Sequence, residues 1–392
     1  MNIINLDRIS SNPLLPEVQE AMIEAIKANY GNPSSQHKMG DAAGEVLEKA
    51  RTSVATLIQA KNPREVVFTS GGTESVNHAI KGIAFAHRDK GKHIVTSNIE
   101  HNSVIRSLRA LKMLGYQVTS LPVDHHGLVD PENVLKAVKK DTILISIIHG
   151  NNEIGTIQPI EEIAEIAKEK KILFHVDAVD SVGVVPVDVQ KSRVDLLSFA
   201  SNPYYGPTGI GGLYIRSGIK IWPLLDGGTQ EFNKRAGAEN LIGIMGMGVA
   251  ADLAHRQMAA RLSKLRKLRE KLTAELPNYI DEYIINGHPE SVLPNLLSVS
   301  IKYIEGESVV LMLDDDNIAV STRSACASGS LRASHVLLST GLEFADAQGT
   351  LVITFGVDNT EGDLMTFLNA LKGTVATLRS MSPLYKSAKE VT

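Results

Sequence analysis

The sequence predicts an α/β protein, with a doubly wound, mostly parallel sheet in a large domain and a smaller α+β domain after it. Short apolar runs alternate with stretches of helical periodicity through the first two-thirds of the chain, a pattern typical of a parallel sheet with helices on both sides. The 392 residues, 43% of them apolar, can bury the cores of two domains. A long charged stretch over residues 247–276 predicts one continuous helix leading from the first domain to the second.

Seven apolar runs in the first part of the chain have the length and composition of buried strands. They cover residues 66–69, 93–97, 117–121, 143–148, 172–176, 195–199 and 212–216. An amphipathic helix is predicted over residues 159–171, because Ile160, Ile163 and Ala167 share one face.

The smaller domain is predicted from the pattern that follows the long helix. That helix ends near Pro277, and strands are expected at 296–301 and 351–355. We place the domain boundary inside the helix. The large domain then comprises residues 14–258, and the small domain comprises residues 1–13 and 259–392.

The composition excludes several classes of function. The net charge is −4 and lysine and arginine form no dense block, so no nucleic-acid partner is expected. The sequence has no apolar run of the roughly 20 residues that cross a bilayer, and its N-terminus lacks the pattern of a signal peptide. We therefore expect a cytoplasmic protein with no membrane association. Cys326 is the single cysteine, which excludes internal disulfides and an all-cysteine metal cluster within one subunit.

A glycine turn, Ser70-Gly71-Gly72-Thr73, follows the first predicted strand. Backbone N–H groups at the start of the next helix can bind a phosphate at such a turn. Gly72 and Thr73 are the candidate residues, and Thr73 adds a hydroxyl donor. The same pattern also occurs as a helix cap with no ligand, so the turn alone leaves both interpretations open.

Three polar motifs follow the second, fourth and fifth predicted strands. They are Glu100-His101, Asn151-Asn152 and Asp177. Taken singly, each of these side chains is more often a hydrogen-bonded structural residue than a ligand. A carboxylate in such a place can, however, keep a cofactor's ring nitrogen protonated, which makes the ring an electron sink.

In this order, the motifs resemble those of the cysteine desulfurases of the aminotransferase class V family. The segment at residues 204–211, Tyr-Tyr-Gly-Pro-Thr-Gly-Ile-Gly, resembles that family too, and the resemblance extends over nearly the whole chain. It implies the fold type I of enzymes that use pyridoxal phosphate (PLP), with PLP as the cofactor. It also implies a homodimer, because relatives build each site at the subunit interface.

The resemblance further implies a role for each motif. The phosphate of PLP would bind at Gly72 and Thr73. The ring would stack on His101, with its nitrogen at Asp177 and its hydroxyl oxygen near Asn152. Asn32, in a Gly-Asn-Pro loop, is similar to a substrate-binding residue of the family, whose substrate is L-cysteine.

The sequence departs from the family pattern where cofactor and substrate would bind. Pro203 occupies the position of the lysine that joins PLP through an imine, and proline has no side-chain amine. Val357 occupies the position of the arginine that binds the substrate carboxylate. Further departures are at Asp180, Ala200, Asn202 and Ala238. A charged hydrogen bond contributes on the order of 1.5–3 kcal/mol, so we expect these losses together to weaken binding by orders of magnitude.

Cys326 lies in a stretch of small residues, 324–330, that is typical of an exposed loop. A lone cysteine is often buried and unreactive, whereas the neighbouring Arg323 would favour the thiolate. The stretch resembles the family loop whose cysteine becomes a persulfide, so Cys326 is the candidate catalytic residue. The resemblance also implies an iron–sulfur scaffold protein as partner, and the thiolate could ligate iron of a cluster shared with it.

Three hypotheses remain open from the sequence. In the first, the chain handles sulfur for iron–sulfur cluster assembly through Cys326, as a persulfide carrier or a cluster ligand, with PLP-dependent desulfuration weak or lost. In the second, it is a working desulfurase that converts L-cysteine to L-alanine and a persulfide without an imine. In the third, it is a structural pseudoenzyme that pairs with an active paralogue.

Overall fold

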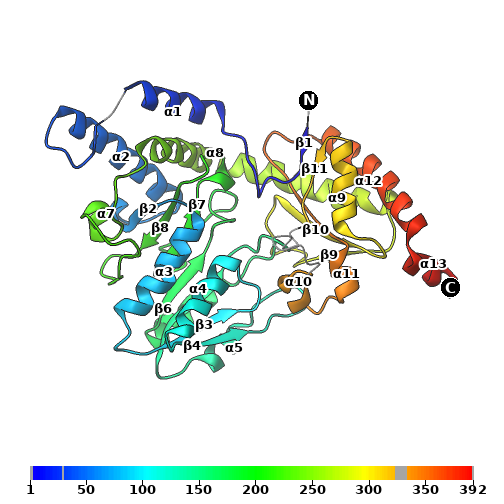
Figure 1. The fold of residues 1–392 in the computed structure, drawn as a ribbon, viewed down its shortest axis with the longest axis horizontal. Coiled ribbons are helices and arrows are strands. Elements are labelled where there is room, and N and C mark those ends of the chain that lie inside the picture. Colours follow the sequence, from blue (N-terminus) through cyan, green and yellow to red (C-terminus); the bar gives the residue numbers. More distant parts are fainter. Residues whose placement is uncertain (1–2, 29–30, 323–332, 391–392) are drawn as a thin grey trace.

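The computed structural model describes residues 3–28, 31–322 and 333–390, and a seven-stranded sheet forms the centre of its larger part (Figure 1). The strand order is β2-β8-β7-β6-β5-β3-β4. The strands from β7 to β4 run parallel, whereas β8 is antiparallel to both β2 and β7. The prediction of a mostly parallel sheet is therefore confirmed. In the same order, the strands are Val66–Thr69, Gly211–Ile215, Leu196–Ala200, Leu173–Asp177, Thr142–Ile148, His93–Ser97 and Gln117–Leu121.

Helices cover both faces of this sheet. α3 (Gly72–Ala86) and α4 (Asn102–Met113) share a core with one face, and α2 (Lys38–Leu57), α6 (Ile160–Lys170) and α8 (Leu241–Glu275) share a core with the other. A sheet covered in this way buries both faces of its central strands, which explains why they form continuous apolar runs in the sequence. The helix predicted over residues 159–171 is confirmed as α6.

The long helix α8 begins at Leu241, earlier than the predicted start at residue 247. Glycines in this first part argue against a helix from sequence alone, because each costs about 1 kcal/mol relative to alanine in a helix interior. In the structure they allow close packing. A Cβ on Gly248 would lie 2.6 Å from the Cα of Ala50 in α2, and one on Gly246 would lie 2.8 Å from the Sδ of Met22 in α1 (Pro16–Ala28). Tertiary packing therefore overrides the low helix propensity.

A three-stranded antiparallel sheet, β12-β10-β9, forms the centre of the smaller part. Its strands are Thr350–Thr354, Leu296–Ile301 and Tyr283–Asn286, so the strand predicted at 296–301 is confirmed and that at 351–355 is shifted by one residue. α9 (Gly306–Asp315) and α12 (Glu361–Met381) share its core with the C-terminal half of α8. β1 (Ile4–Asn5) pairs with β11 (Ile318–Ala319), next to this core. The domain boundary near residue 258 stays a prediction.

Shorter elements connect these parts. They are η1 (Pro63–Glu65), α5 (Pro131–Ala137), η2 (Asn202–Tyr204), α7 (Gln230–Asn233), η3 (Leu276–Asn278), α10 (His335–Ser339), α11 (Phe344–Gln348) and α13 (Pro383–Glu390). Within the described ranges, none of the helices is both long enough and apolar enough to cross a membrane.

A buried ion pair holds the turn at α7 in an unusual backbone conformation. Glu231, Phe232 and Asn233 have φ angles of 46°, 59° and 64°. This left-handed region costs residues with a Cβ about 1–2 kcal/mol each. The Arg51 guanidinium donates to both carboxylate oxygens of Glu231, at 2.7 and 2.8 Å, and its carbon lies 4.9 Å from the centre of the Phe232 ring. These contacts stabilise a turn that its backbone alone disfavours.

Candidate functional site

The sequence motifs meet at one edge of the main sheet. β2, β3, β5 and β6 point the same way, so the residues that follow them lie along the same edge. Gly72 and Thr73 follow β2, His101 follows β3, Asn152 follows β5, and Asp177 ends β6. The carboxyl edge of a parallel sheet is where folds of this type bind ligands.

Asp177 is a buried carboxyl at the centre of this edge, with an exposure of 2%. Its Oδ1 accepts a hydrogen bond from the Val179 N–H, at 3.2 Å. Burial, together with the nearby carboxyl of Asp180, raises the pKa of Asp177 to about 7. A cationic ring nitrogen placed here would supply the positive charge that the carboxylate needs, so Asp177 suits that role.

Glu100 is a second buried carboxyl beside the same edge. Its Oε1 accepts from the Ser97 hydroxyl at 2.6 Å and from the Ile148 N–H at 3.0 Å, while its buried Oε2 has no hydrogen-bond partner among the described residues. Burial raises the pKa of Glu100 to about 8, and Asp177 adds to this rise in pKa. Glu100 therefore ties the loop after β3 to β5 and holds a proton at neutral pH. The sequence placed it only next to His101 and gave no signal of its burial.

These two carboxyls predict how stability depends on pH. The pKa of Glu100 is raised from 4.5 to about 8, so the folded protein binds this proton more tightly than the unfolded chain does. Stability is therefore expected to fall as pH rises through this interval, by about 1.4 kcal/mol per unit of pKa difference. Urea unfolding at a series of pH values measures the fall. Glu100→Gln, which keeps the acceptor oxygen but has no proton to lose, is expected to make the fall smaller and to leave the part that the raised pKa of Asp177 contributes.

The matched control for this experiment is Glu290→Gln, at an exposed glutamate in the smaller part of the molecule. This variant is expected to retain the pH dependence of the unmodified protein. If the free energy of unfolding fell equally steeply with pH in the unmodified protein and in Glu100→Gln, the assignment of a protonated Glu100 would be contradicted.

His101 and Asn152 border the site in different ways. His101 caps the start of α4, and its Nδ1 accepts from the Ser103 N–H at 3.1 Å and lies 2.7 Å from the Ser103 hydroxyl oxygen. These contacts fix the orientation of its ring. Asn151 has a structural role, since it is buried and its side chain bonds to three main-chain groups. The side chain of half-buried Asn152 has no hydrogen-bond partner within the described ranges, so it is available for a ligand.

The glycine turn presents the start of α3 to the same region. Gly71 has φ 147°, which only glycine adopts readily, and no side chain caps the helix. The first N–H groups of a helix have no acceptor within it, and Gly72 and Thr73 carry two of them. A Cβ on Gly72 would lie 2.5 Å from the Cγ2 of Val179. Glycine at this position thus allows the helix start to approach the loop that follows Asp177.

Pro203 is buried in the turn η2, and its side chain carries no amine. The Asn12 side chain donates to the main-chain oxygen of Asn202 at 3.0 Å and holds the turn in place. Lys234 is a lysine from a different loop. Its Nζ lies 5.9 Å from the centre of the Phe232 ring, beside the Arg51–Glu231 pair, and burial lowers its pKa. Its contacts therefore lie at α7 and not at Asp177.

The main-chain N–H and carbonyl groups of Val357 both have protein partners. The Val357 N–H donates to the Tyr205 hydroxyl oxygen at 2.6 Å, and the Val357 carbonyl oxygen accepts from Lys264. Two further cations lie near Tyr205. Arg8 pairs with Asp358 at 2.5 Å, and Arg261 lies over the Tyr205 ring at 5.3 Å. Each of these three cations is already engaged with a protein group.

These residues fit noncovalent recognition of PLP but not its covalent attachment. Asp177 would offer a carboxyl to the ring nitrogen, His101 would offer a ring to stack on, and the start of α3 would offer N–H groups for the phosphate. When bound, PLP supplies an electron sink. The amine that would link it to the chain is absent from position 203, where the buried proline ring lies instead.

Cys326 and Arg323 lie outside the described residues, but both ends of their segment are described. Before it, Ser321 pairs with Val352 of β12. After it, the Ser334 hydroxyl donates to the Glu153 carboxylate, and His335 Nε2 lies 3.0 Å from the Glu100 carbonyl oxygen. The segment therefore ends beside the loops that carry His101 and Asn152. Sequence analysis gave no signal for these anchoring contacts.

Asn32 is an exposed residue and lies at a different cavity. Its side-chain oxygen accepts from the Ser34 N–H at 2.8 Å, and it lines a cavity of about 450 Å³ together with Pro33, Ala238 and Asn240. The structure thus brings Asn32 together with Ala238, and not with the Asp177 group, within one chain.

Comparisons with known proteins agree with the fold. A family model described as aminotransferase class-V matches residues 4–367. The protein named cysteine desulfurase IscS of Dictyoglomus turgidum is 48% identical over 380 residues, covering 97% of this chain and 96% of that protein. The one of Methanosarcina thermophila is 48% identical over 381 residues, covering 97% and 94%. A solved structure titled NifS-like protein has a TM-score of 0.90 and 36% identity, covering 96% of this chain and all of that chain.

Proposed function

Because the chain belongs to the aminotransferase class-V family and is related to its IscS-type cysteine desulfurases, we propose that it handles sulfur for iron–sulfur cluster assembly through Cys326. Cys326 would act as a persulfide carrier or as a ligand of a cluster shared with a scaffold protein. PLP-dependent desulfuration of L-cysteine would be weak or lost. The chain would work as a homodimer, as the family resemblance implies.

The observation that carries this proposal is the contrast between the parts of the site. Asp177, His101 and the start of α3 would supply the groups that recognise PLP. Pro203 removes the covalent link, and the Val357 main chain is occupied by Tyr205 and Lys264. Ser334 and His335, which follow the Cys326 segment in the chain, contact Glu153 and Glu100 beside the sheet edge. The sulfur-handling residue is thus retained while the groups for breaking the C–S bond are depleted.

Sulfur transfer by Cys326 needs no cofactor when the donor is itself a persulfide. The Cys326 thiolate would attack the outer sulfur of the donor, one S–S bond would form and one would break, and the donor would leave as a thiolate. No net oxidation occurs in this exchange. A thiolate is the required form, as in thiol–disulfide exchange.

The experiment that tests this proposal offers a small-molecule persulfide to the purified protein and measures the intact mass. The unmodified protein is expected to gain one sulfur atom, and the gain is expected to disappear in Cys326→Ala. Ser328→Ala, in the same segment, is the matched control and is expected to gain sulfur normally. A gain that survives Cys326→Ala, or its absence from the unmodified protein, would contradict a persulfide-carrier role.

The cluster-ligand version is measured separately. Iron and sulfide are supplied to the protein with and without a scaffold partner, and the bound iron is determined. Binding that requires both the scaffold and Cys326 would support this version. Binding that is independent of Cys326 would rule it out.

A second candidate function is desulfuration of L-cysteine with noncovalently bound PLP, and the retained carboxyl of Asp177 favours it. A yellow protein that releases sulfide from L-cysteine, with both properties lost in Asp177→Ala, would support this function over the first. A colourless protein that stays inactive with added PLP would exclude it.

A further inference from the structure

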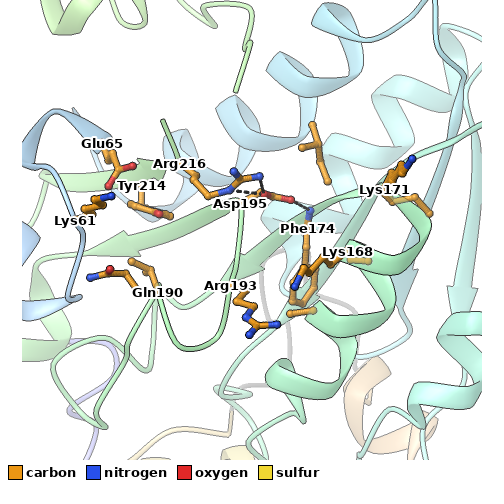
Figure 2. Close-up of a pocket in the computed structure, with 15 residues that line it drawn as sticks. Lys61, Glu65, Lys168, Lys171, Phe174, Gln190, Arg193, Asp195, Tyr214 and Arg216 are labelled. Atoms are coloured by element: carbon orange, nitrogen blue, oxygen red, sulfur yellow. Dashed lines mark hydrogen bonds and ion pairs between the residues drawn. The ribbon is translucent and has the colours of Figure 1, made fainter. Parts of the chain in front are cut away.

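A cavity of about 560 Å³ opens at the amino ends of the parallel strands β6 and β7, whereas the candidate site lies at the carboxyl ends (Figure 2). Phe174, near the start of β6, and Asp195, just before β7, line it, whereas Asp177 ends β6. Three residues of extended strand span about 10 Å, so β6 separates this cavity from the candidate site. None of the residues assigned to PLP or sulfur chemistry lines it.

The carboxylates of the cavity are satisfied by the protein itself. Asp195 accepts from the Phe174 N–H at 2.9 Å with one oxygen and from Arg216 with the other, as the dashed lines in Figure 2 show. Glu65 accepts from the Ser217 N–H at 2.8 Å and from the Asn62 N–H at 3.2 Å. Asp195 is thus balanced by Arg216, whereas Glu65 receives only neutral N–H donors and keeps its single negative charge.

Three lysines of the cavity are not balanced in this way. Lys61, Lys168 and Lys171 line it from the loop after α2, from α6 and from the end of α6. Their ammonium groups form no ion pair or hydrogen bond with any residue of the described ranges. Other lysines of the same region do pair, as Lys191 does with Glu161 at 2.8 Å. The rim of the cavity thus carries net positive charge.

Tyr214 adds a neutral donor and an aromatic surface. It lies in β8, is only 3% exposed and lines the same cavity as the lysines. Burial raises the pKa of its phenol, and Glu65 adds to this rise in pKa, so the hydroxyl keeps its proton. Its hydroxyl has no hydrogen-bond partner within the part of the chain that the structure describes. Ile172 and Val189 contribute apolar surface beside it.

We propose that this cavity binds a small phosphate-bearing anion with a flat aromatic ring, of the nucleoside phosphate class. The phosphate would pair with the ammonium groups of Lys168 and Lys171 on one side of the cavity, and the ring would pack on the apolar surface around Tyr214, on the side where Lys61 lies (Figure 2). Ligand pockets of about 300–1,000 Å³ hold molecules of this size, and lysine binds phosphate as a point charge. The proposal rests on residues separate from Cys326 and Asp177, so it stands independently of the sulfur chemistry.

The test is calorimetric titration of the full chain with adenosine monophosphate (AMP). AMP is a better probe than PLP, because an aldehyde would react with the lysines directly. Saturable binding is expected, weaker at high salt because the contacts are ionic. Adenosine and inorganic phosphate are each expected to bind more weakly than AMP, because adenosine lacks the phosphate and inorganic phosphate lacks the ring.

Variants identify the residues responsible. Lys168→Gln is expected to weaken AMP binding about fivefold, the upper range for a solvent-exposed ion pair. The triple variant Lys61→Gln, Lys168→Gln, Lys171→Gln is expected to abolish measurable binding. Lys267→Gln, at an exposed position of α8 outside the cavity, is the matched control and should bind AMP normally.

Several outcomes would overturn this proposal. They are no heat at millimolar AMP, an equal loss in Lys267→Gln, and retained binding in the triple variant. Adenosine binding as tightly as AMP would show that the lysines have no role, and inorganic phosphate binding as tightly would show that the ring has none. Circular dichroism of each variant checks that a loss of binding is not a loss of fold.

Discussion

Replacing Pro203 by lysine is expected to allow covalent attachment of PLP but to give little turnover of L-cysteine. The lysine restores an amine and a proton-transfer group, a role worth roughly 10²–10⁴ in rate. Val357 still leaves the substrate carboxylate without a cation. Adding Val357→Arg is expected to raise kcat/KM by a further factor of about 10–100, since a charged hydrogen bond contributes about 1.5–3 kcal/mol. Alanine formation from L-cysteine measures turnover, and visible absorbance that survives dialysis measures attachment.

Two variants control this experiment. Pro203→Ala removes the proline ring from η2 without adding an amine, so it reports the structural cost of the change alone. Val357→Leu, combined with Pro203→Lys, matches the arginine variant without its charge. Full turnover from Pro203→Lys alone would contradict our account of Val357 and would direct attention to Arg261, the buried cation beside Tyr205.

Arg51→Met is expected to produce the largest loss of stability of any single change considered for this protein. It would leave the Glu231 carboxylate buried without its cation, at a side-chain exposure of 2%. Breaking a buried ion pair from one side costs about 3–5 kcal/mol. Arg51 also donates to the Val66 carbonyl oxygen at 2.8 Å, so β2 loses a contact as well. Urea unfolding, monitored by circular dichroism, measures the change in the free energy of unfolding.

The exposed pair Arg256–Asp252 on α8 is the matched control, with side-chain exposures of 61% and 50%. Arg256→Met is expected to change stability by less than about 1 kcal/mol. The double variant Arg51→Met, Glu231→Leu is expected to recover part of the loss, because no unpaired charge remains buried. A loss in Arg51→Met as small as that in Arg256→Met would show that the α7 turn does not depend on the ion pair.

Sequence periodicity predicted the strands of the main sheet to within one or two residues, because β5, β6 and β7 are buried on both faces and read as apolar runs. It failed at the start of α8. The glycines there have low helix propensity, and only the close approach of Ala50 and Met22 explains why they are helical. Nothing in the local sequence carries that information.

The candidate site likewise has features that follow from the sequence and features that only the tertiary structure explains. That His101, Asn152 and Asp177 lie at one edge follows from sequence order, because parallel strands end at the same edge of a sheet. The burial that raises the pKa of Glu100 could not be foreseen, since it depends on β5 and on the Cys326 segment's anchors. Nor could the position of Lys234, which packs at α7.

The sequence by itself determined the family, the order of the motifs and the absence of an amine at position 203, because residue identity is a local property. Tertiary structure alone decided which charges are balanced. Arg8, Lys264 and Arg51 are each satisfied by groups distant in the chain, whereas Asp177 and the lysines of the second cavity are not. Electrostatic balance depends on distance and burial in three dimensions, and neither is written in the spacing of residues along the chain.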